Sequence, residues 1–366
     1  MKVCIVSHNA YGAMAGGGHV GGVEMQTAEL ARYLAAQGHE TSILVWDETN
    51  GATQVVADVN LVPICRRNAG IPILKFFWPR WTSLSRCLRE VDADVYYHNG
   101  AEYFTGLIAI YCRANNKPFV FSTASDDDCS VQLEFLGKAY ERWLYRWGLR
   151  NADAVICQTG AQERALLENF DRPATTLPMP CSFDVQAVAK PRANRSVLWV
   201  GRIIELKRLE MYLDIAERLP SVDFYIAGGA DDDADYANQM ISRAESIANV
   251  SYLGVLDRKA MVELYAQNSL LICTSRLEGF PNTFIEAWGS GVPVITTYDP
   301  DNVIRDNELG TVANSVTDLA ADIESVLDDD SRYQGLRKNA LQYFKQHHER
   351  RVALGRFAEF LQLQLK

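Results

Sequence analysis

The sequence predicts an α/β protein built from two doubly wound, parallel-sheet domains, and three observations carry this prediction. The chain has 366 residues, more than one hydrophobic core usually serves. Short apolar runs rich in Val, Ile and Tyr alternate with helical patterns in both halves. Between the halves, residues 178–195 contain three prolines and follow neither periodicity. We therefore expect a first domain over residues 1–180, a second over 181–342, and a final helix over 343–366 that packs back on the first domain.

Five apolar runs in the first half and four in the second are expected to form strands. The helix after the first run has apolar side chains at helical spacing from Val23 to Leu34, and Gly38 fits the position just past its last turn. The second half repeats the pattern, with apolar side chains at helical spacing from Leu209 to Leu219. The expected strands are residues 3–7, 41–46, 94–97, 119–122, 154–157, 196–200, 223–227, 270–274 and 292–296.

Composition narrows the class of protein. The formal charge of -10, from 36 basic and 46 acidic residues, argues against nucleic acid as the main partner, because phosphate neutralisation needs a basic face. The eight cysteines form no Cys-x-x-Cys pair and are interpreted as reduced, packed thiols. No apolar stretch approaches the length of a membrane span, and the first residues enter a strand without a signal-peptide pattern, so we expect a cytoplasmic protein.

The most informative pattern is Glu278-Gly-Phe-Pro-Asn-Thr-Phe-Ile-Glu286, which follows an expected strand and opens into a helix. Amides at Asn282 and Thr283 would lie at the positive end of that helix, which suits a diphosphate. Glu286, a turn further on, could accept hydrogen bonds from both hydroxyls of a ribose. The alternative is ordinary helix capping beside a solvated glutamate.

Basic residues follow the expected strand 196–200. Gly201-Arg202 stands at its end, and Lys207 and Arg208 begin the next helix. Ligands of open α/β sheets bind beyond the carboxyl ends of the strands, so Arg202 and Lys207 are expected to hold phosphates and stabilise a departing nucleoside diphosphate. These cations would supply the charge of a metal ion, and we expect no essential metal. Acidic clusters at residues 92–94, 126–128 and 231–233 are interpreted as solvated loops.

A glycine-rich segment over residues 16–22 links the first strand to the first helix. Its glycines, Gly21 and Gly22 among them, would let the backbone approach a substrate closely. The segment lacks the Gly-x-Gly-x-x-Gly register of dinucleotide-binding proteins, which a nicotinamide-binding or other nucleotide-binding regulator would need. Taken alone, it could also be a flexible loop.

Together these motifs resemble those of retaining glycosyltransferases of family 4, and the similarity extends over nearly the whole chain. Gly21-Gly22-Val23-Glu24 is similar to the glycine motif of that family, Gly201-Arg202 with Lys207 to its phosphate-binding pair, and Glu278 to Glu286 to its Glu-x7-Glu motif. The resemblance implies the GT-B fold, in which two Rossmann-like domains face each other across a cleft. The first domain would bind the acceptor and the second the nucleotide-sugar donor.

The resemblance also implies residue roles. Glu278 would bind the transferred sugar, and Gly22 would approach the donor. The full set expected to bind the donor is Gly21, Gly22, Arg202, Lys207, Gly279, Phe280, Asn282, Thr283 and Glu286.

One departure from the family pattern concerns Ser125. The family commonly places a histidine there, close to the transferred sugar, and serine cannot take up a proton near neutral pH. Either Asp126 or His98 assumes the acceptor-facing role, or the departing phosphate itself removes the acceptor proton, as the family mechanism allows. The expected catalytic residues are Glu278, Lys207, Arg202, His98 and Asp126.

Residues 60–90 hold six basic side chains and one acid, interleaved with four aromatic residues over 76–81. This mixture suits an anionic membrane surface, with residues 75–81 as the contact and a lipid-linked acceptor. The alternative is a helix with a packed aromatic face and a solvated basic face. The function expected is transfer of a hexose-type sugar from a UDP- or GDP-sugar to a glycan or lipid-linked saccharide in surface polysaccharide biosynthesis. A nucleotide-sugar epimerase of the same fold and a non-catalytic nucleotide-binding protein are the alternatives.

Overall fold

The structure is a computed structural model that describes residues 1–16, 21–70, 76–181, 195–230 and 234–365. The chain divides into two compact units. Unit 1 comprises Met1–Pro178 and Ala353–Lys366, and unit 2 comprises Met179–Val352. The boundary thus falls two residues before the expected one. Most of the proline-containing segment 178–195 between the halves lies outside the described residues.

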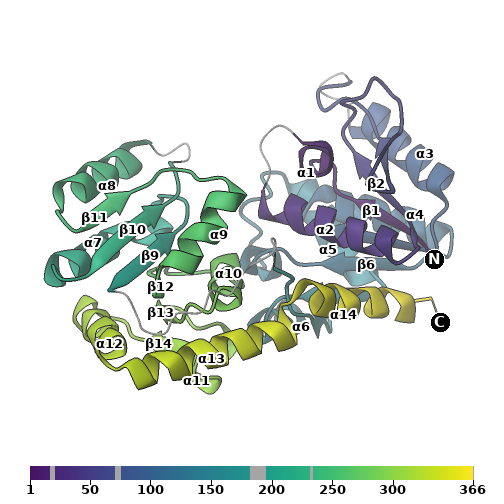
Figure 1. Ribbon diagram of the computed structural model, residues 1–366. Helices are drawn as coiled ribbons and strands as arrows, with labels where there is room; N and C mark the ends of the chain where they lie inside the picture. The colour runs from purple at the N-terminus through teal and green to yellow at the C-terminus, as the bar shows by residue number, and fades with distance from the viewer. Residues whose placement is uncertain (17–20, 71–75, 182–194, 231–233, 366) are drawn as a thin grey trace. The chain divides into compact units, whose positions relative to one another are not determined.

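Unit 1 contains an eight-stranded sheet in the order β3-β4-β2-β1-β5-β6-β7-β8. Figure 1 labels β1, β2 and β6 of this sheet, with α2 and α4 among the helices around it. All neighbours are parallel except β3 and β4. The strands are β1 (Lys2–Val6), β2 (Glu40–Val45), β3 (Gln54–Val56), β4 (Val59–Pro63), β5 (Val95–Asn99), β6 (Phe119–Ser122), β7 (Ala154–Cys157) and β8 (Thr175–Thr176).

Helices cover both faces of this sheet, because successive strand residues point to opposite sides. Val3 and Ile5 pack with α1 (Tyr11–Ala15), α2 (Gly22–Ala36) and α14 (Arg350–Leu363). Cys4 and Val6 pack on the other side with α3 (Thr82–Val91), α4 (Tyr103–Ala114), α5 (Ala139–Asn151) and α6 (Gly160–Phe170). The segment η1 (Phe76–Trp81), which is kinked at Trp78, precedes α3, and the 3-10 turn η2 (Asp126–Cys129) follows β6.

Two glycines let α4 and α5 pack at close range. A Cβ added to Gly106 would lie 2.4 Å from the carbonyl oxygen of Leu144, and one added to Gly148 would lie 2.5 Å from the carbonyl carbon of Thr105. This contact presses one face of α5 onto α4 and leaves its opposite face outside.

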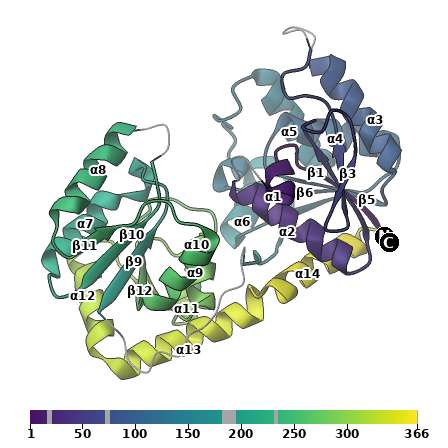
Figure 2. The ribbon, with the colours of Figure 1, turned by 45° about the horizontal axis from the view of Figure 1, so that its top comes forward.

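Unit 2 contains a six-stranded, all-parallel sheet in the order β11-β10-β9-β12-β13-β14. One core cluster joins the sheet to α7, α8 and α12, and a second joins it to α9, α10, α11 and α13 (Figure 2). The strands are β9 (Ser196–Val200), β10 (Asp223–Ala227), β11 (Val250–Tyr252), β12 (Leu270–Cys273), β13 (Val294–Thr296) and β14 (Gly310–Val312). The helices are η3 (Glu205–Lys207), α7 (Leu209–Arg218), α8 (Ala234–Ser246), α9 (Arg258–Gln267), α10 (Asn282–Gly289), η4 (Pro300–Asn302), α11 (Val303–Asp306), α12 (Val316–Asp328) and α13 (Asp330–His347).

The nine strands expected from the sequence are all present, with ends that differ by two residues at most. Gly38 follows α2 with φ of +81°, as expected for a residue just past a helix. Five further strands were not expected from the sequence: β3, β4, β8, β11 and β14. They are two to five residues long and lie at or next to a sheet edge, so their apolar patterns are too short to recognise. The eight cysteines are free thiols, and seven of them are buried.

The expectation of one helix over residues 343–366 is wrong. The segment contains the end of α13 and a separate helix, α14, and unit 1 resumes at Ala353. The break lies at His348, whose carbonyl accepts a hydrogen bond from the Cys181 amide at 3.0 Å. The His348 ring Nδ1 lies 2.7 Å from the carbonyl oxygen of Met179. These contacts hold the end of α13 to unit 2, whereas α14 packs on the sheet of unit 1 through Leu354, Phe357 and Leu361.

Candidate active site

Two charged side chains meet beyond the carboxyl ends of β9 and β12. The Lys207 ammonium donates a hydrogen bond to Oε1 of Glu278 and forms an ion pair with it. The two side chains are only 21% and 16% exposed, so solvent screens the pair less than it would a surface pair. The expected cation and the expected sugar-binding carboxylate are therefore direct partners.

The loops that carry this pair are also joined to each other. The Ser275 hydroxyl donates to the same Glu278 oxygen at 2.6 Å, which orients the carboxylate from a second side. The Thr274 hydroxyl donates to the carbonyl oxygen of Lys207 at 2.7 Å, and the amide of Arg276 donates to the carbonyl oxygen of Leu206 at 3.0 Å. The position of Lys207 is thus coupled to the end of β12.

Arg208 stands at the start of α7, as expected, but its guanidinium is held by other protein groups. It has φ of +49° and precedes α7. Its guanidinium donates to the Thr297 hydroxyl at 2.7 Å and to the carbonyl oxygen of Thr274, so it holds the ends of β12 and β13 together. Lys207 ends η3, and Arg202 is exposed in the preceding loop. Arg208 therefore binds protein groups at the ends of these strands, whereas Arg202 and Lys207 are the cations expected to hold phosphates.

Glu286 is held by a residue that the sequence analysis did not single out. The hydroxyl of Tyr265, on α9, donates to Oε2 of Glu286 at 2.7 Å. Tyr265 is fully buried, and burial together with the Glu286 charge raises the pKa of its hydroxyl well above the ordinary range. The hydroxyl therefore stays protonated and donates to the Glu286 carboxylate, which orients that side chain.

Four of the expected donor-binding residues, Gly279, Phe280, Asn282 and Thr283, lie just before or at the start of α10, which begins at Asn282 with Pro281 as its N-cap. Asn282 and Thr283 therefore occupy the first turn, at the positive end of the helix dipole. The carbonyl of Gly279 accepts a hydrogen bond from the Tyr298 hydroxyl at 3.2 Å. The Phe280 ring lies 5.2 Å from the ring of His348, centroid to centroid, so it packs beside the end of α13.

A close backbone contact supports the loop after β9. Gly228, at the end of β10, has φ of +148°, and an added Cβ would lie 1.8 Å from the carbonyl oxygen of Gly201. Only glycine fits this position, so the Gly201-Arg202 turn depends on it.

In unit 1, polar side chains gather beyond the carboxyl ends of β1 and β5. His98 is almost fully buried, and its Nδ1 lies 2.7 Å from the carbonyl oxygen of Val6. Burial lowers the pKa of His98 to about 4, which makes it neutral at pH 7. His8 lies nearby with its Nδ1 3.3 Å from Oε2 of Glu102. Burial lowers the pKa of His8 to about 3 and raises that of Glu102 to about 8.

Ser125, which stands where the family has a histidine, is the N-cap of η2 and forms a capping box with Asp128. Asp126 accepts a hydrogen bond from the Gln162 side-chain amide at 2.8 Å. Asp128 corrects the interpretation of residues 126–128 as a solvated cluster, because it is 4% exposed and accepts hydrogen bonds from the amides of Ala124 and Ser125.

Gly21 is the N-cap of α2 and Gly22 its first residue, and α1 intervenes between them and β1, so the segment is more than a simple loop. The rest of the glycine segment, residues 17–20, lies outside the described residues. In the segment 75–81, Lys75 and the side chains of Phe76 and Phe77 are likewise outside the description.

Of the described side chains of that segment, one is exposed to solvent and two contact the rest of unit 1. Trp78 is 63% exposed. Arg80 stacks 5.6 Å above the Trp46 ring and donates to Tyr103, while Trp81 packs on the core.

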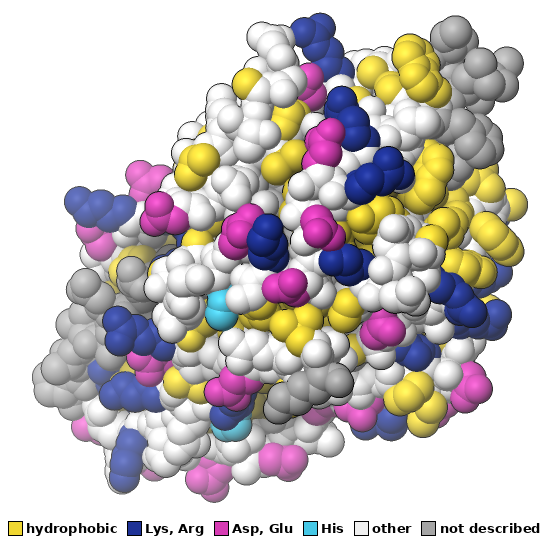
Figure 3. Space-filling view, turned by 90° about the vertical axis from the view of Figure 1, so that its right-hand side faces the viewer, with side chains coloured by type: hydrophobic (Ala, Val, Ile, Leu, Met, Phe, Trp, Pro, Cys, Tyr) yellow, Lys and Arg dark blue, Asp and Glu magenta, His cyan; other side chains and the backbone are white. Residues whose placement is uncertain are grey.

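The described residues also bear on metal binding, membrane-spanning helices and surface charge. Within the described part of the chain, no group of three or more His, Cys, Asp or Glu side chains could hold a metal ion, and no helix is long and apolar enough to cross a membrane. The face in Figure 3 mixes acidic and basic side chains and carries no single basic field.

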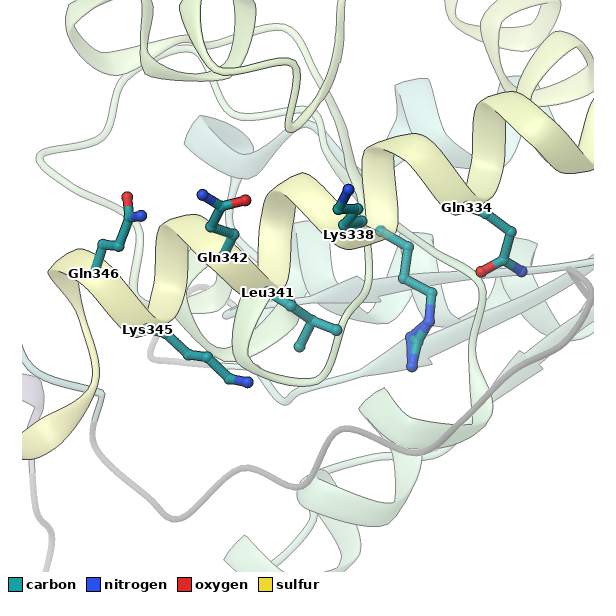
Figure 4. Close-up of a pocket in the computed structure, with 7 residues that line it drawn as sticks. Gln334, Lys338, Leu341, Gln342, Lys345 and Gln346 are labelled. Carbon is teal, nitrogen blue, oxygen red and sulfur yellow. The ribbon is translucent and has the colours of Figure 1, made fainter.

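A hollow of about 560 Å³ lies along α13 (Figure 4), but its seven lining residues all belong to that one helix. It contains neither Lys207, Glu278 nor Glu286.

Two α/β units whose sheets are parallel apart from the β3–β4 pair have the GT-B fold, which solved glycosyltransferase structures share. Residues 20–183 match the family described as Glycosyltransferase Family 4, and residues 183–343 match Glycosyl transferases group 1. The chain belongs to glycosyltransferase family 4 and is a transferase.

Relatives and solved structures agree with this assignment. The lipopolysaccharide core biosynthesis glycosyltransferase LpsE of Rhizobium meliloti is 23% identical over 197 residues, which cover 50% of this chain and 56% of that protein. Mannosylfructose-phosphate synthase of Agrobacterium fabrum is 25% identical over 40% of this chain and 38% of its own length. The chain thus matches about half or less of the length of these two relatives.

Among solved structures, sucrose-phosphate synthase from Thermosynechococcus elongatus superposes with a TM-score of 0.77 at 18% identity, over 99% of this chain and 98% of that one. HepE of Anabaena, in complex with UDP and glucose, superposes with a TM-score of 0.75 at 18% identity, over 99% of each chain. These likenesses establish the shared fold.

Proposed function

We propose that this glycosyltransferase transfers a hexose-type sugar, with retention of anomeric configuration, from a UDP- or GDP-sugar to a glycan or lipid-linked saccharide in surface polysaccharide biosynthesis. The observation that carries the proposal is the Lys207–Glu278 pair beyond β9 and β12, with Glu286 at the next turn of the helix that follows. LpsE, named for lipopolysaccharide core biosynthesis, and HepE, solved with UDP and glucose, support the choice of pathway and donor.

Unit 2 would bind the donor. Glu286, oriented by the Tyr265 hydroxyl, accepts hydrogen bonds from the ribose hydroxyls. The start of α10, Arg202 and Lys207 face the diphosphate, where their positive charge compensates the phosphate oxygens. An ammonium group has three hydrogens, so Lys207 can contact a phosphate while it keeps Glu278. Glu278 then accepts hydrogen bonds from hydroxyls of the transferred sugar.

The reaction breaks the bond between the anomeric carbon and the diphosphate oxygen, and an acceptor hydroxyl forms the new bond on the same face of the sugar. The acceptor proton passes to the departing phosphate oxygen, whose developing charge Lys207 and Arg202 stabilise. No imidazole is required in this scheme, which is consistent with Ser125 as a helix cap. His98 is neutral and Asp126 is bound by Gln162, and we assign both to orienting the acceptor in unit 1.

No essential metal is needed, because the two basic side chains supply the charge that a divalent ion would otherwise provide. Peripheral contact with the inner face of the cytoplasmic membrane is assigned to residues 75–81, where Trp78 is exposed.

The proposal is tested by incubating the protein with a panel of nucleotide sugars, with and without saccharide and lipid-linked saccharide acceptors, in the presence of EDTA. We expect acceptor-dependent release of the nucleoside diphosphate and, by proton NMR, the anomeric configuration of the donor in the product. A changed free sugar that forms equally without acceptor would indicate an epimerase, and an inverted product would refute retention.

A further inference from the structure

The outer face of α5 and the segment before it present an unusual group of exposed aromatic side chains. Four large aromatic residues are exposed in the described part of the chain, and three of them lie within nine residues. These are Phe135, Tyr140 and Trp143, which are 48%, 43% and 59% exposed, and Val131 beside them is 44% exposed. Bulky aromatic side chains are rarely left in water in such a group unless the surface has a partner.

The helix α5 separates three kinds of side chain around its axis. Leu144, Tyr145, Gly148 and Leu149 are buried against α4 and the core. At 100° per residue, Tyr140, Trp143 and the half-buried Trp147 form a second stripe.

The third stripe is basic, because Arg142, Arg146 and Arg150 follow one another at intervals of four residues. It runs directly beside the aromatic stripe on the same helix. An aromatic stripe beside a basic one is the pattern of helices that lie at an anionic membrane surface.

The preceding segment is fastened to this helix, so its aromatic residues belong to the same surface. The Arg146 guanidinium donates to the carbonyl oxygen of Val131 at 2.5 Å. Leu133 and Leu136 are buried, which turns the neighbouring Phe135 outward. The ammonium of Lys138 lies 5.5 Å above the Tyr140 ring.

The local charge of this surface favours an anionic lipid surface, although the protein as a whole is acidic. Residues 131–150 carry four basic and two acidic side chains in a chain with a net charge of -10. Glu141, one of the two acids, accepts a hydrogen bond from the Tyr140 hydroxyl and is near Lys138. Unit 1 as a whole is almost neutral, with 18 basic and 20 acidic residues, while unit 2 has 18 and 26. Each Lys or Arg at an anionic bilayer favours binding roughly fivefold.

We propose that residues 131–150 form a membrane-docking surface of unit 1, in which Phe135, Tyr140 and Trp143 enter the interface of an anionic bilayer and Arg142 and Arg150 contact lipid phosphates. The surface lies apart in sequence from residues 75–81 and does not depend on their role. It borders the edge of unit 1 that we assign to the acceptor, because the Tyr145 hydroxyl of α5 donates to the carbonyl oxygen of Asp128, two residues from Asp126, at 2.6 Å. A lipid-linked acceptor would then meet the enzyme where the membrane does.

The test is co-sedimentation of the purified protein with vesicles of phosphatidylcholine alone or with phosphatidylglycerol added. We expect binding to the anionic vesicles, and a loss of about tenfold or more in the partition coefficient for the double variant Phe135→Ser/Trp143→Ser. The matched control is Leu167→Ser, which removes an equally exposed apolar side chain from α6 and should bind as the unchanged protein does. The variant Arg142→Gln/Arg150→Gln should bind more weakly and with a shallower dependence on salt.

Phe135, Trp143, Arg150 and Leu167 are exposed and Arg142 is partly exposed, so the melting temperature should change little. Equal vesicle binding by the Phe135/Trp143 variant and the unchanged protein would overturn the proposal, as would failure of the unchanged protein to bind anionic vesicles. A dimer in sedimentation velocity that this variant abolishes, without any vesicle binding, would show that a second copy covers the surface. Nucleotide binding by the same variants should stay unchanged, so this test can fail while the proposed sugar transfer stands.

Discussion

Replacement of Tyr265 by phenylalanine would show whether Glu286 must be held in place to bind the donor. The ring is fully buried and phenylalanine keeps its shape, so the change removes one hydroxyl and little packing. The lost contact is a 2.7 Å hydrogen bond to an ionised carboxylate, a type that contributes about 1.5–3 kcal/mol. The bond exists with and without nucleotide, so only the cost of orienting a loosened Glu286 enters the affinity. If that cost is about 1.4 kcal/mol, because the half-buried carboxylate regains part of the lost contact from water, the dissociation constant of the nucleotide rises about tenfold.

The assay is isothermal titration with the nucleoside diphosphate that the unchanged protein binds best, on Tyr265→Phe, Glu286→Ala and the double variant. If Tyr265 acts through Glu286, it should add little once Glu286 is gone, so the effects of the two substitutions should not sum. Equal affinity of Tyr265→Phe and the unchanged protein, or fully additive effects, would refute the reasoning.

Three other predictions follow from the geometry of single residues. Lys207→Met should lower kcat about a hundredfold and affect donor binding less, because its charge matters most as the diphosphate departs; an equal loss in both would contradict this role. Gly228→Ala should destabilise unit 2 by about 3 kcal/mol or more in urea titrations, because its Cβ would lie 1.8 Å from the Gly201 carbonyl oxygen, whereas Gly335→Ala, with no atom within 4 Å, should be neutral or slightly stabilising. The pKa of His98 is lowered to about 4, so the unfolded chain binds its proton first as pH falls. The contribution of neutral His98 to the free energy of unfolding is therefore fully present above pH 6.5 and declines towards pH 4 by up to about 1.4 kcal/mol per pH unit. The variant His98→Asn should flatten the pH dependence of the free energy of unfolding over that range.

The fold was predictable where the sequence has long apolar runs. Strands such as β9 and β12 are buried on both faces and are flanked by clear helical patterns, so the two parallel sheets could be inferred. Edge strands of two or three residues such as β8 and β14 carry too little pattern. The break between α13 and α14 was missed because it depends on contacts of His348 with residues far away in sequence, Met179 and Cys181.

In the candidate site, too, residues of a local motif were predictable, whereas contacts between distant parts of the chain were not. Glu278 and Glu286 were recognisable because they flank a helix start at a fixed spacing in the sequence. Tyr265 was not, since it lies 21 residues from Glu286 and belongs to no motif. Lys207 was recognisable as a cation, but its ion pair with Glu278, 71 residues away, was not. Ser275 was within reach of sequence reasoning, because it stands at the end of β12 three residues before Glu278.

The exposed aromatic face of α5 had no such signal, because its composition suits a buried helix equally well. Only the close packing at Gly106 and Gly148 shows which face is buried.

The central claim is that unit 2 binds a nucleotide-diphosphate sugar through Glu286 and its basic neighbours without a metal ion. The most direct measurement is a calorimetric titration of the protein with UDP, GDP, ADP and their common sugar conjugates in the presence of EDTA, repeated on Glu286→Ala. We predict micromolar binding of one nucleotide family that is lost in the variant. Absence of binding across the whole panel, or binding that the variant retains in full, would contradict the account.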